Sequence, residues 1–179
     1  MKRTLFQANE IEASEATSDD GPALQSLFEE CADFIELTTG LPPAPAEVQS
    51  LFTALPEGKT YDDKLVIRLL SKTDGLVGVM DVVRDYPELE AWWLGLMLLR
   101  PDLRKLGRGN LVIRSLMEWA AANGAKWIYL AVVAQNVGAR RFWDRMGFDT
   151  VETRPPARIG ARVSVVIVMR CMTPSLRGA

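Results

Sequence analysis

The hydrophobic pattern changes character once, in the middle of the chain. Residues 92–99 contain no charged side chain, which is typical of a strand covered on both faces. Apolar residues then recur at helical spacing over residues 106–120. Between these two segments lies the basic sequence RKLGRG at 104–109. The pattern therefore predicts a strand, a glycine-containing turn and a helix that ends near Gly124.

Upstream of this unit, the pattern predicts two helices and two paired strands. The polar segment TSDDGP at 17–22 favours the start of a helix that reaches about residue 37. A proline-rich connector leads to a second short helix over residues 47–55. Strands over 64–70 and 76–83 form a hairpin around an Asp-Gly turn, so three antiparallel strands precede the basic turn. Residues 1–13 show no strong period, so residues 1–15 are expected to be a loose lead-in, with a short edge strand that ends near Ala16 as the alternative.

Downstream, residues 126–134 form a strand with almost no polar side chain. A strand-helix-strand unit places this strand parallel to residues 92–99. A short helix over 136–146 follows. The last strands are expected over 148–152 and 162–171, separated by a turn at Arg154-Pro155-Pro156 and a bend at Ile159-Gly160. We interpret residues 1–179 as one domain, with a loose end from residue 173.

The basic turn has the chemistry of an anion site. Glycine at positions 107 and 109 removes side chains that would keep an oxyanion from the backbone N–H groups. The first turn of the following helix adds unpaired N–H groups and the positive end of its dipole, so a phosphate or pyrophosphate is the expected ligand. The turn lacks the Gly-Lys-Ser/Thr of a P-loop and the third glycine of a dinucleotide fingerprint.

Two motifs resemble those of the GNAT superfamily of acyl-CoA-dependent N-acetyltransferases. Arg104, Gly107 and Gly109 fit motif A, Arg/Gln-x-x-Gly-x-Gly/Ala, between a strand and a helix. The sequence NVGARRFWDRMGF at 136–148 fits motif B, Asn-x-x-Ala-x-x-Phe-Tyr-x-x-x-Gly-Phe, at every fixed place but one. The two motifs stand in the expected order, and the resemblance covers residues 16–171.

The resemblance implies a fold and a cofactor. The fold class is α/β (α+β): the GNAT fold, a mixed, mostly antiparallel sheet flanked by helices, with a parallel pair that splays at the cofactor cleft. The cofactor is acetyl-CoA, held by the main chain of the central strand, by the basic turn and by three residues of the second motif. The residues implied are Met97, Leu98, Leu99, Arg104, Lys105, Leu106, Gly107, Arg108, Gly109, Asn110, Asn136, Arg141 and Trp143. Gly95, inside the apolar strand, fits either a bulge that opens the sheet or a site of close packing.

The amino-acid composition excludes several kinds of catalytic site. The chain of 179 residues is 48% hydrophobic and 25% charged, as is ordinary for one globular domain. It contains no histidine, which excludes Ser-His and Cys-His nucleophilic catalysis. The two cysteines, Cys31 and Cys171, show no metal-ligand spacing, so neither a disulfide framework nor a metal site is indicated.

The catalytic groups are less well defined than the cofactor site. Trp143 stands where the family often has tyrosine, and an indole cannot protonate a leaving thiolate, so this side chain packs either against the cofactor or in the core. The attacking amine must lose a proton, and Glu90 is the preferred base, with Glu88, Asp85 and Asp81 as alternatives. Tyr86, in the same turn as Glu90, either lines the acceptor pocket or is a packed turn residue.

We therefore expect an N-acetyltransferase that uses direct attack on acetyl-CoA by a primary amine of a small molecule or peptide. The alternative is a non-catalytic acyl-CoA-binding regulatory module of the same fold. A nucleic-acid-binding module would rest only on the cluster of arginines, and a net charge of −2 argues against it. No apolar run is long enough to span a bilayer and the start has no signal-peptide pattern, so we expect a cytoplasmic protein with no membrane partner. A homodimer is expected from the habit of the family.

Overall fold

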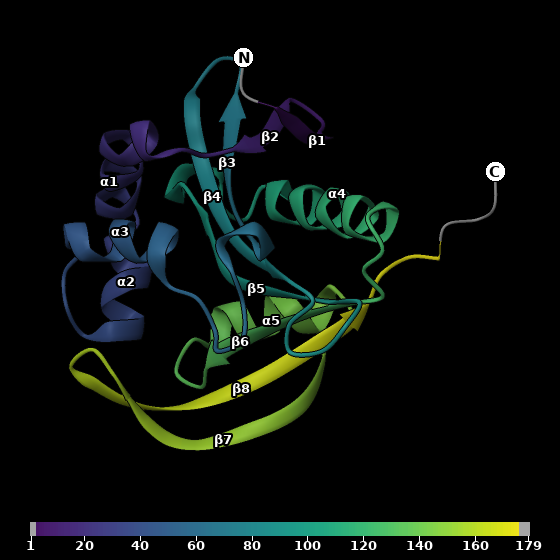
Figure 1. Cartoon of the computed structure of the whole chain (residues 1–179). Helices are drawn as coiled ribbons and strands as arrows, with labels where there is room; N and C mark the ends of the chain where they lie inside the picture. Colours follow the sequence, from purple (N-terminus) through teal and green to yellow (C-terminus); the bar gives the residue numbers. More distant parts are fainter. Residues whose placement is uncertain (1–2, 176–179) are drawn as a thin grey trace.

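The structure, a computed structural model, describes residues 3–175 and places one sheet between two layers of helices (Figure 1). Within these residues the strands are β1 (Thr4–Ala8), β2 (Ile11–Glu15), β3 (Lys64–Ser71), β4 (Gly75–Arg84), β5 (Ala91–Leu99), β6 (Trp127–Val133), β7 (Asp149–Ile159) and β8 (Arg162–Met172). The α-helices are α1 (Gly21–Glu30), α2 (Ala32–Thr39), α3 (Pro45–Thr53), α4 (Arg108–Ala122) and α5 (Val137–Arg145). Short 3-10 turns are η1 (Ser18–Asp20), η2 (Tyr61–Asp63) and η3 (Pro101–Leu103). No helix in residues 3–175 is both long enough and apolar enough to cross a membrane.

The strand order is β1-β2-β3-β4-β5-β6-β8-β7. Neighbouring strands run antiparallel except β5 and β6, which run parallel. Helix α4 makes the crossover between these two strands. The predicted mixed, mostly antiparallel sheet with one parallel pair is confirmed.

The parallel pair separates part of the way along its length. Pairing of β5 with β6 runs from Ala91 opposite Trp127 to Leu94 opposite Leu130 and then stops, although both strands continue. Beyond that point β5 pairs only with β4, and β6 pairs only with β8. Gly95 is the extra residue at a register shift between β4 and β5, so the interpretation of this glycine as a bulge is confirmed. Within residues 3–175, the backbone edges that face each other across the gap have no ladder partner.

Each face of the sheet has its own apolar core. Helices α4 and α5 cover one face, where side chains such as Ile113, Leu116 and Trp143 are buried against the strands. Helices α1 to α3 cover part of the other face with residues such as Leu24 and Phe28. Full burial of a large aliphatic or aromatic side chain contributes about 1.5–3 kcal/mol, so the two cores hold the helices firmly against the sheet.

Of the two expectations for residues 1–15, the loose lead-in is wrong for the part that the structure describes, whereas a strand does end just before Ala16. Strands β1 and β2 form an antiparallel hairpin that extends the sheet beyond β3. Phe6 and Ile11 are buried, and the ring of Phe6 lies 5.7 Å from that of Trp119 on α4. Five-residue strands with alanine at two buried positions give only a weak alternating signal, so the sequence indicated at most one short strand here and not a hairpin.

The predicted helix over residues 17–37 is two helices. The chain leaves helical geometry at Cys31, which is buried and has φ −97° and ψ 23°. Its thiol donates a hydrogen bond to the carbonyl of Leu99 at the end of β5. Neither glycine nor proline marks this break, so only packing against β5 explains it.

The C-terminal expectations need two corrections. The chain does not turn at Pro155 and Pro156, because β7 runs through them; the predicted bend at Ile159-Gly160 is confirmed as the hairpin turn, with φ +60° at Gly160. Proline is tolerated because β7 is an edge strand, exposed along nearly its whole length, and the prolines fall where its register with β8 shifts. Thr173 is not loose either, since it is buried and donates to the carbonyl of Ala125 at 2.7 Å. Residues 176–179 lie outside the described part.

Candidate functional site

A cavity of about 1060 Å³ opens where β5 and β6 separate. The two strands line it with residues 94–97, 99 and 130–133. The basic turn and α5 line one end, and α2, α3 and the tip of the β7–β8 hairpin line the other. The cavity thus joins the predicted anion turn to the gap in the sheet.

The basic turn presents free backbone donors at one end of this cavity. Gly107 has φ +76° and forms the N-cap of α4, and both Gly107 and Gly109 line the cavity. Among residues 3–175, no acceptor bonds the N–H groups of residues 105–109. A Cβ at Gly107 would have no neighbour within 4 Å, whereas one at Gly109 would lie 3.3 Å from the ring of Phe142. This geometry fits an anion held by main-chain N–H groups at a helix N-terminus.

The arginines of the turn are less available than their sequence positions indicate. Arg104 lines the cavity, but its Nε donates to the carbonyl of Leu99 at 2.9 Å and its Nη1 lies 2.6 Å from Asp33 Oδ2. Arg108 reaches instead toward Glu10, with 3.7 Å between Nη1 and Oε2, and is not part of the lining. Of Arg104 and Arg108, only Arg104 therefore places its positive charge in the lining of the cavity.

The other predicted cofactor residues divide into two groups. Lys105, Asn110 and the β5 residues Met97 and Leu99 line the cavity, as does Arg141 on α5. Leu98 and Leu106 do not: Leu98 is buried in the core under α1 to α3, and Leu106 is 65% exposed on the outside of the turn. Arg145, one helical turn after Arg141, also lines the cavity and was not among the predicted site residues. Its i,i+4 spacing from Arg141 was the available signal.

Asn136 lines the cavity and also caps helix α5. Its Oδ1 accepts the N–H of Ala139 at 3.0 Å and so caps the first turn of α5. Its Nδ2 has no acceptor among the described residues and remains available for a ligand.

Trp143 is both a core residue and part of the cavity wall. It is 8% exposed and packs edge-to-face with Phe142 and Phe148, at ring-centroid distances of 4.8 and 5.1 Å. This position gives the site an apolar surface and no acidic proton.

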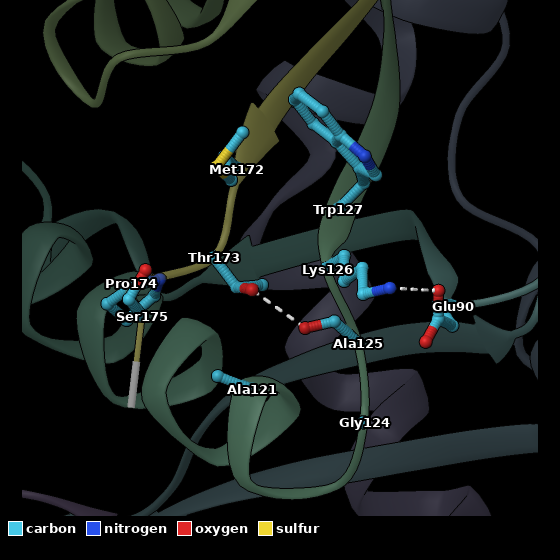
Figure 2. Close-up of a pocket in the computed structure, with 10 residues that line it drawn as sticks. All are labelled: Glu90, Ala121, Gly124, Ala125, Lys126, Trp127, Met172, Thr173, Pro174 and Ser175. Carbon is cyan, nitrogen blue, oxygen red and sulfur yellow. Dashed lines mark hydrogen bonds and ion pairs between the residues drawn. The ribbon is translucent and has the colours of Figure 1, made fainter. Parts of the chain in front are cut away.

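The structure places Glu90 and Tyr86 outside the cavity. Glu90 precedes β5, about six strand residues or roughly 20 Å before the splayed end. It forms an ion pair of 2.6 Å with Lys126 and lines a separate, smaller cavity of about 480 Å³ (Figure 2). Tyr86 packs edge-to-face on Trp93, with ring centroids 5.6 Å apart. The sequence alone did not show which end of β5 lies at the cavity, because polar residues flank both ends of the strand.

Two of the alternative bases are also committed elsewhere. Asp85 Oδ1 accepts the N–H of Glu90 at 2.9 Å within the turn between β4 and β5. Glu88 accepts a hydrogen bond of 2.9 Å from the hydroxyl of Tyr129. Neither residue lines the large cavity.

Asp81 is the carboxylate on β4 that reaches the large cavity. Its Oδ1 accepts a hydrogen bond of 2.7 Å from the Nζ of Lys64, whose side chain is only 4% exposed. Its Oδ2 faces Gly95, where a Cβ would stand 3.1 Å away. Burial raises the pKa of Asp81, and the Lys64 ammonium offsets part of that rise. An aspartate inside an otherwise apolar strand was the signal in the sequence.

The far end of the cavity is closed by contacts between distant segments. The N–H of Ala161, at the tip of the β7–β8 hairpin, donates to the carbonyl of Thr39 at 2.7 Å. Gln135 bridges the same region by donating to Ser164 Oγ at 2.7 Å and to the carbonyl of Leu37 at 3.4 Å. Helices α2 and α3 line the same cavity as Asp81.

Comparisons with known proteins point to one family. The model described as the acetyltransferase (GNAT) family matches residues 23–148. An uncharacterized N-acetyltransferase of Bacillus subtilis (strain 168), YobR, is 28% identical over 125 residues, which are 66% of this chain and only 44% of that protein.

Solved structures share the fold at low sequence identity. RimL, a ribosomal L7/L12 alpha-N-protein acetyltransferase, has a TM-score of 0.77 at 15% identity and covers 96% of this chain and 95% of its own. Spermidine N-acetyltransferase from Vibrio cholerae, in complex with CoA and spermine, has a TM-score of 0.71 at 14% identity over 92% and 96%. An acetyltransferase from Thermus thermophilus has a TM-score of 0.69 at 22% identity over 92% and 99%. With a family model that covers most of the chain and the same fold in these structures, the protein belongs to the GNAT acetyltransferase family.

Proposed function

We propose that this protein is an N-acetyltransferase that transfers the acetyl group of acetyl-CoA to a primary amine of a small molecule or peptide. One observation carries the proposal: a single cavity joins free backbone N–H groups at 105–109 to the unpaired edges of β5 and β6. An anion site and an extended slot for amide groups are the two features that a phosphorylated pantetheine thioester requires.

The lining residues fit such a donor. The N–H groups of residues 105–109 would hold the pyrophosphate, with Arg141 and Arg145 available to further phosphate charge. The pantetheine amides would pair with the main chain around Met97 and Leu99 and with Nδ2 of Asn136. The side chains of Leu98, Leu106 and Arg108 have no part in this arrangement.

The donor supplies an acetyl thioester, and the chain supplies a base and hydrogen-bond donors. Asp81 Oδ2 faces the bulge at Gly95 and takes the proton that the amine loses as its nitrogen bonds to the acetyl carbon. Backbone N–H groups of β5 beyond Leu94 donate to the carbonyl oxygen. The carbon–sulfur bond then breaks, and water protonates the thiolate because Trp143 has no acidic proton.

Isothermal titration calorimetry tests the donor site. We expect acetyl-CoA to bind with micromolar affinity and Arg104→Glu to weaken it about tenfold or more, because a carboxylate would then face the phosphates. Arg114→Glu is the matched control: it makes the same charge change on an exposed residue of α4 that does not line the cavity. Equal affinities for the two variants, or no binding of acetyl-CoA to the unchanged protein, would contradict the proposal.

One observation favours a second function, a non-catalytic acyl-CoA-binding regulatory module. Trp143 occupies the cavity wall where the family often has a tyrosine. Thiol release measured over a panel of amines separates the two functions. Binding of acetyl-CoA without turnover of any amine would favour the regulatory module.

A further inference from the structure

The charge of the large cavity changes from one end to the other. The end beside α5 and the basic turn carries four cations: Arg104, Lys105, Arg141 and Arg145. At the other end, between α2, α3 and the hairpin tip, the charged lining residues are Glu47 and Asp81. Among the lining cations of residues 3–175, Arg104 also reaches the start of α2, where it pairs with Asp33, and the other three lie on the basic turn and α5.

The nearest cations are engaged elsewhere. Lys64 is bound to Asp81 Oδ1 and almost fully buried behind it. Arg162, on the hairpin, donates through Nε to the carbonyl of Glu36 at 3.1 Å and is not part of the lining. Glu47 receives one hydrogen bond, from the N–H of Ala44, which caps α3 and leaves its negative charge at the cavity.

The walls of this end are mostly apolar, with three hydroxyl side chains. The apolar residues come from α2, α3, β5 and the hairpin tip: Phe34, Ile35, Leu51, Leu96 and Ile159. The hydroxyl groups belong to Thr38, Thr39 and Ser50. These surfaces favour an apolar body, and the two carboxylates favour the positive charge that a primary amine carries before it reacts.

From this lining we infer that the acceptor is a primary amine with an apolar body and no carboxylate beside the amine. The inference rests on the proposed acetyl transfer. A carboxylate held next to the reacting nitrogen would be taken out of water beside Asp81, where the Lys64 ammonium is already bound to Asp81 Oδ1 and does not replace the lost hydration. A neutral amide at the same place carries no such charge.

Three acceptors of nearly equal size test this directly: 2-phenylethylamine, phenylalaninamide and phenylalanine. With acetyl-CoA saturating, thiol release gives kcat/KM for each. We expect the first two to be acetylated and phenylalanine to be slower by about 100-fold or more, because its carboxylate is left unpaired. Spermidine, which has no apolar body of this kind, should also be slower than 2-phenylethylamine.

A charge placed in the wall should change the preference. Ser50 is an exposed residue of α3 that lines the cavity, so Ser50→Arg adds a cation there. We expect the ratio of kcat/KM for phenylalaninamide to that for phenylalanine to fall about tenfold. Gln49→Arg adds the same charge to the neighbouring exposed position, which does not line the cavity, and should leave the ratio unchanged.

The outcomes separate the inference from the function on which it rests. Failure of acetyl-CoA to bind would remove the proposed function. If acetyl-CoA binds but phenylalanine or spermidine is preferred, or only amines outside these four are acetylated, the inferred acceptor class is overturned. Binding without turnover of any amine would instead favour the regulatory module. If Ser50→Arg and Gln49→Arg change the phenylalaninamide-to-phenylalanine ratio of kcat/KM equally, the cavity wall does not set this preference. That result would also overturn the inference.

Discussion

At the scale of single residues, the pair of Asp81 and Lys64 decides how the proposed reaction responds to pH. Burial raises the pKa of Asp81, and the hydrogen-bonded Lys64 ammonium lowers it in part. The other charged lining residue at this end is Glu47 on α3, and residues 94–97 of β5 carry no charge. Lys64 is thus a positioning residue that fixes Oδ1 and leaves Oδ2 toward the cavity.

The fall of kcat/KM at low pH should depend on the pair of Asp81 and Lys64. A base works only when deprotonated, so kcat/KM should rise with pH through the pKa of Asp81, which lies above its ordinary value. Lys64→Gln removes the influence that lowers this pKa, so the fall should move to higher pH. Lys64→Arg keeps the charge and should keep the fall near its original place. A profile of kcat/KM against pH that is identical in all three proteins would contradict a role for Asp81 as the base.

At the scale of elements, the β1–β2 hairpin is held mainly by its buried side chains. Phe6 lies in the main core and contacts the ring of Trp119 on α4, while its neighbour Gln7 is exposed. The hairpin therefore links the edge of the sheet to the helix whose N-terminus forms the anion site.

Truncation of Phe6 should lower the stability of the whole domain. We expect Phe6→Ala to reduce the free energy of unfolding by about 3 kcal/mol, through lost burial and the cavity left beside Trp119. Gln7→Ala, on the opposite face of the same strand, should stay within about 0.5 kcal/mol. Urea unfolding followed by tryptophan fluorescence measures both. A loose N-terminal segment would give two equally small effects.

At the scale of the whole molecule, the two halves of the sheet meet along a short parallel contact. Strands β5 and β6 pair only from Ala91 to Leu94 and then diverge around the cavity. A donor that bonds both edges and the basic turn would connect β5, β6, α4 and α5. Binding should therefore stabilise the whole fold, not just one segment.

Thermal unfolding tests this coupling. At acetyl-CoA concentrations about 100 times Kd, linkage adds about 2.7 kcal/mol, which for a domain of this size raises Tm by roughly 5–10 °C. Gly109→Val directs a side chain toward the ring of Phe142 beneath the anion turn and should abolish most of the shift. Because the variant has its own unliganded Tm, the comparison is between shifts. Equal shifts in the two proteins would place the donor away from this turn.

The local patterns of the chain determined its central unit. The apolar run at 92–99, the glycines at 107 and 109 and the helical period that follows lie within one short stretch, so the sequence alone predicted strand, turn and helix. The parallel partner of β5 followed from the handedness and length of the crossover. The bounds of the three strands before the turn were predicted to within about one residue, because their apolar patterns and the Asp-Gly turn are also local signals.

Tertiary structure decided everything that depends on which faces meet. Glu90 and Asp81 are both carboxylates that precede the splayed part of β5 in the sequence, but of the two only Asp81, which faces the bulge at Gly95, lines the cavity. The pairing of Arg104 with Asp33 joins residues far apart in the chain. The break at Cys31 likewise arises from packing against β5 and has no local signal. Periodicity shows which side of an element is apolar, whereas the partners of a polar group are fixed only when the elements pack.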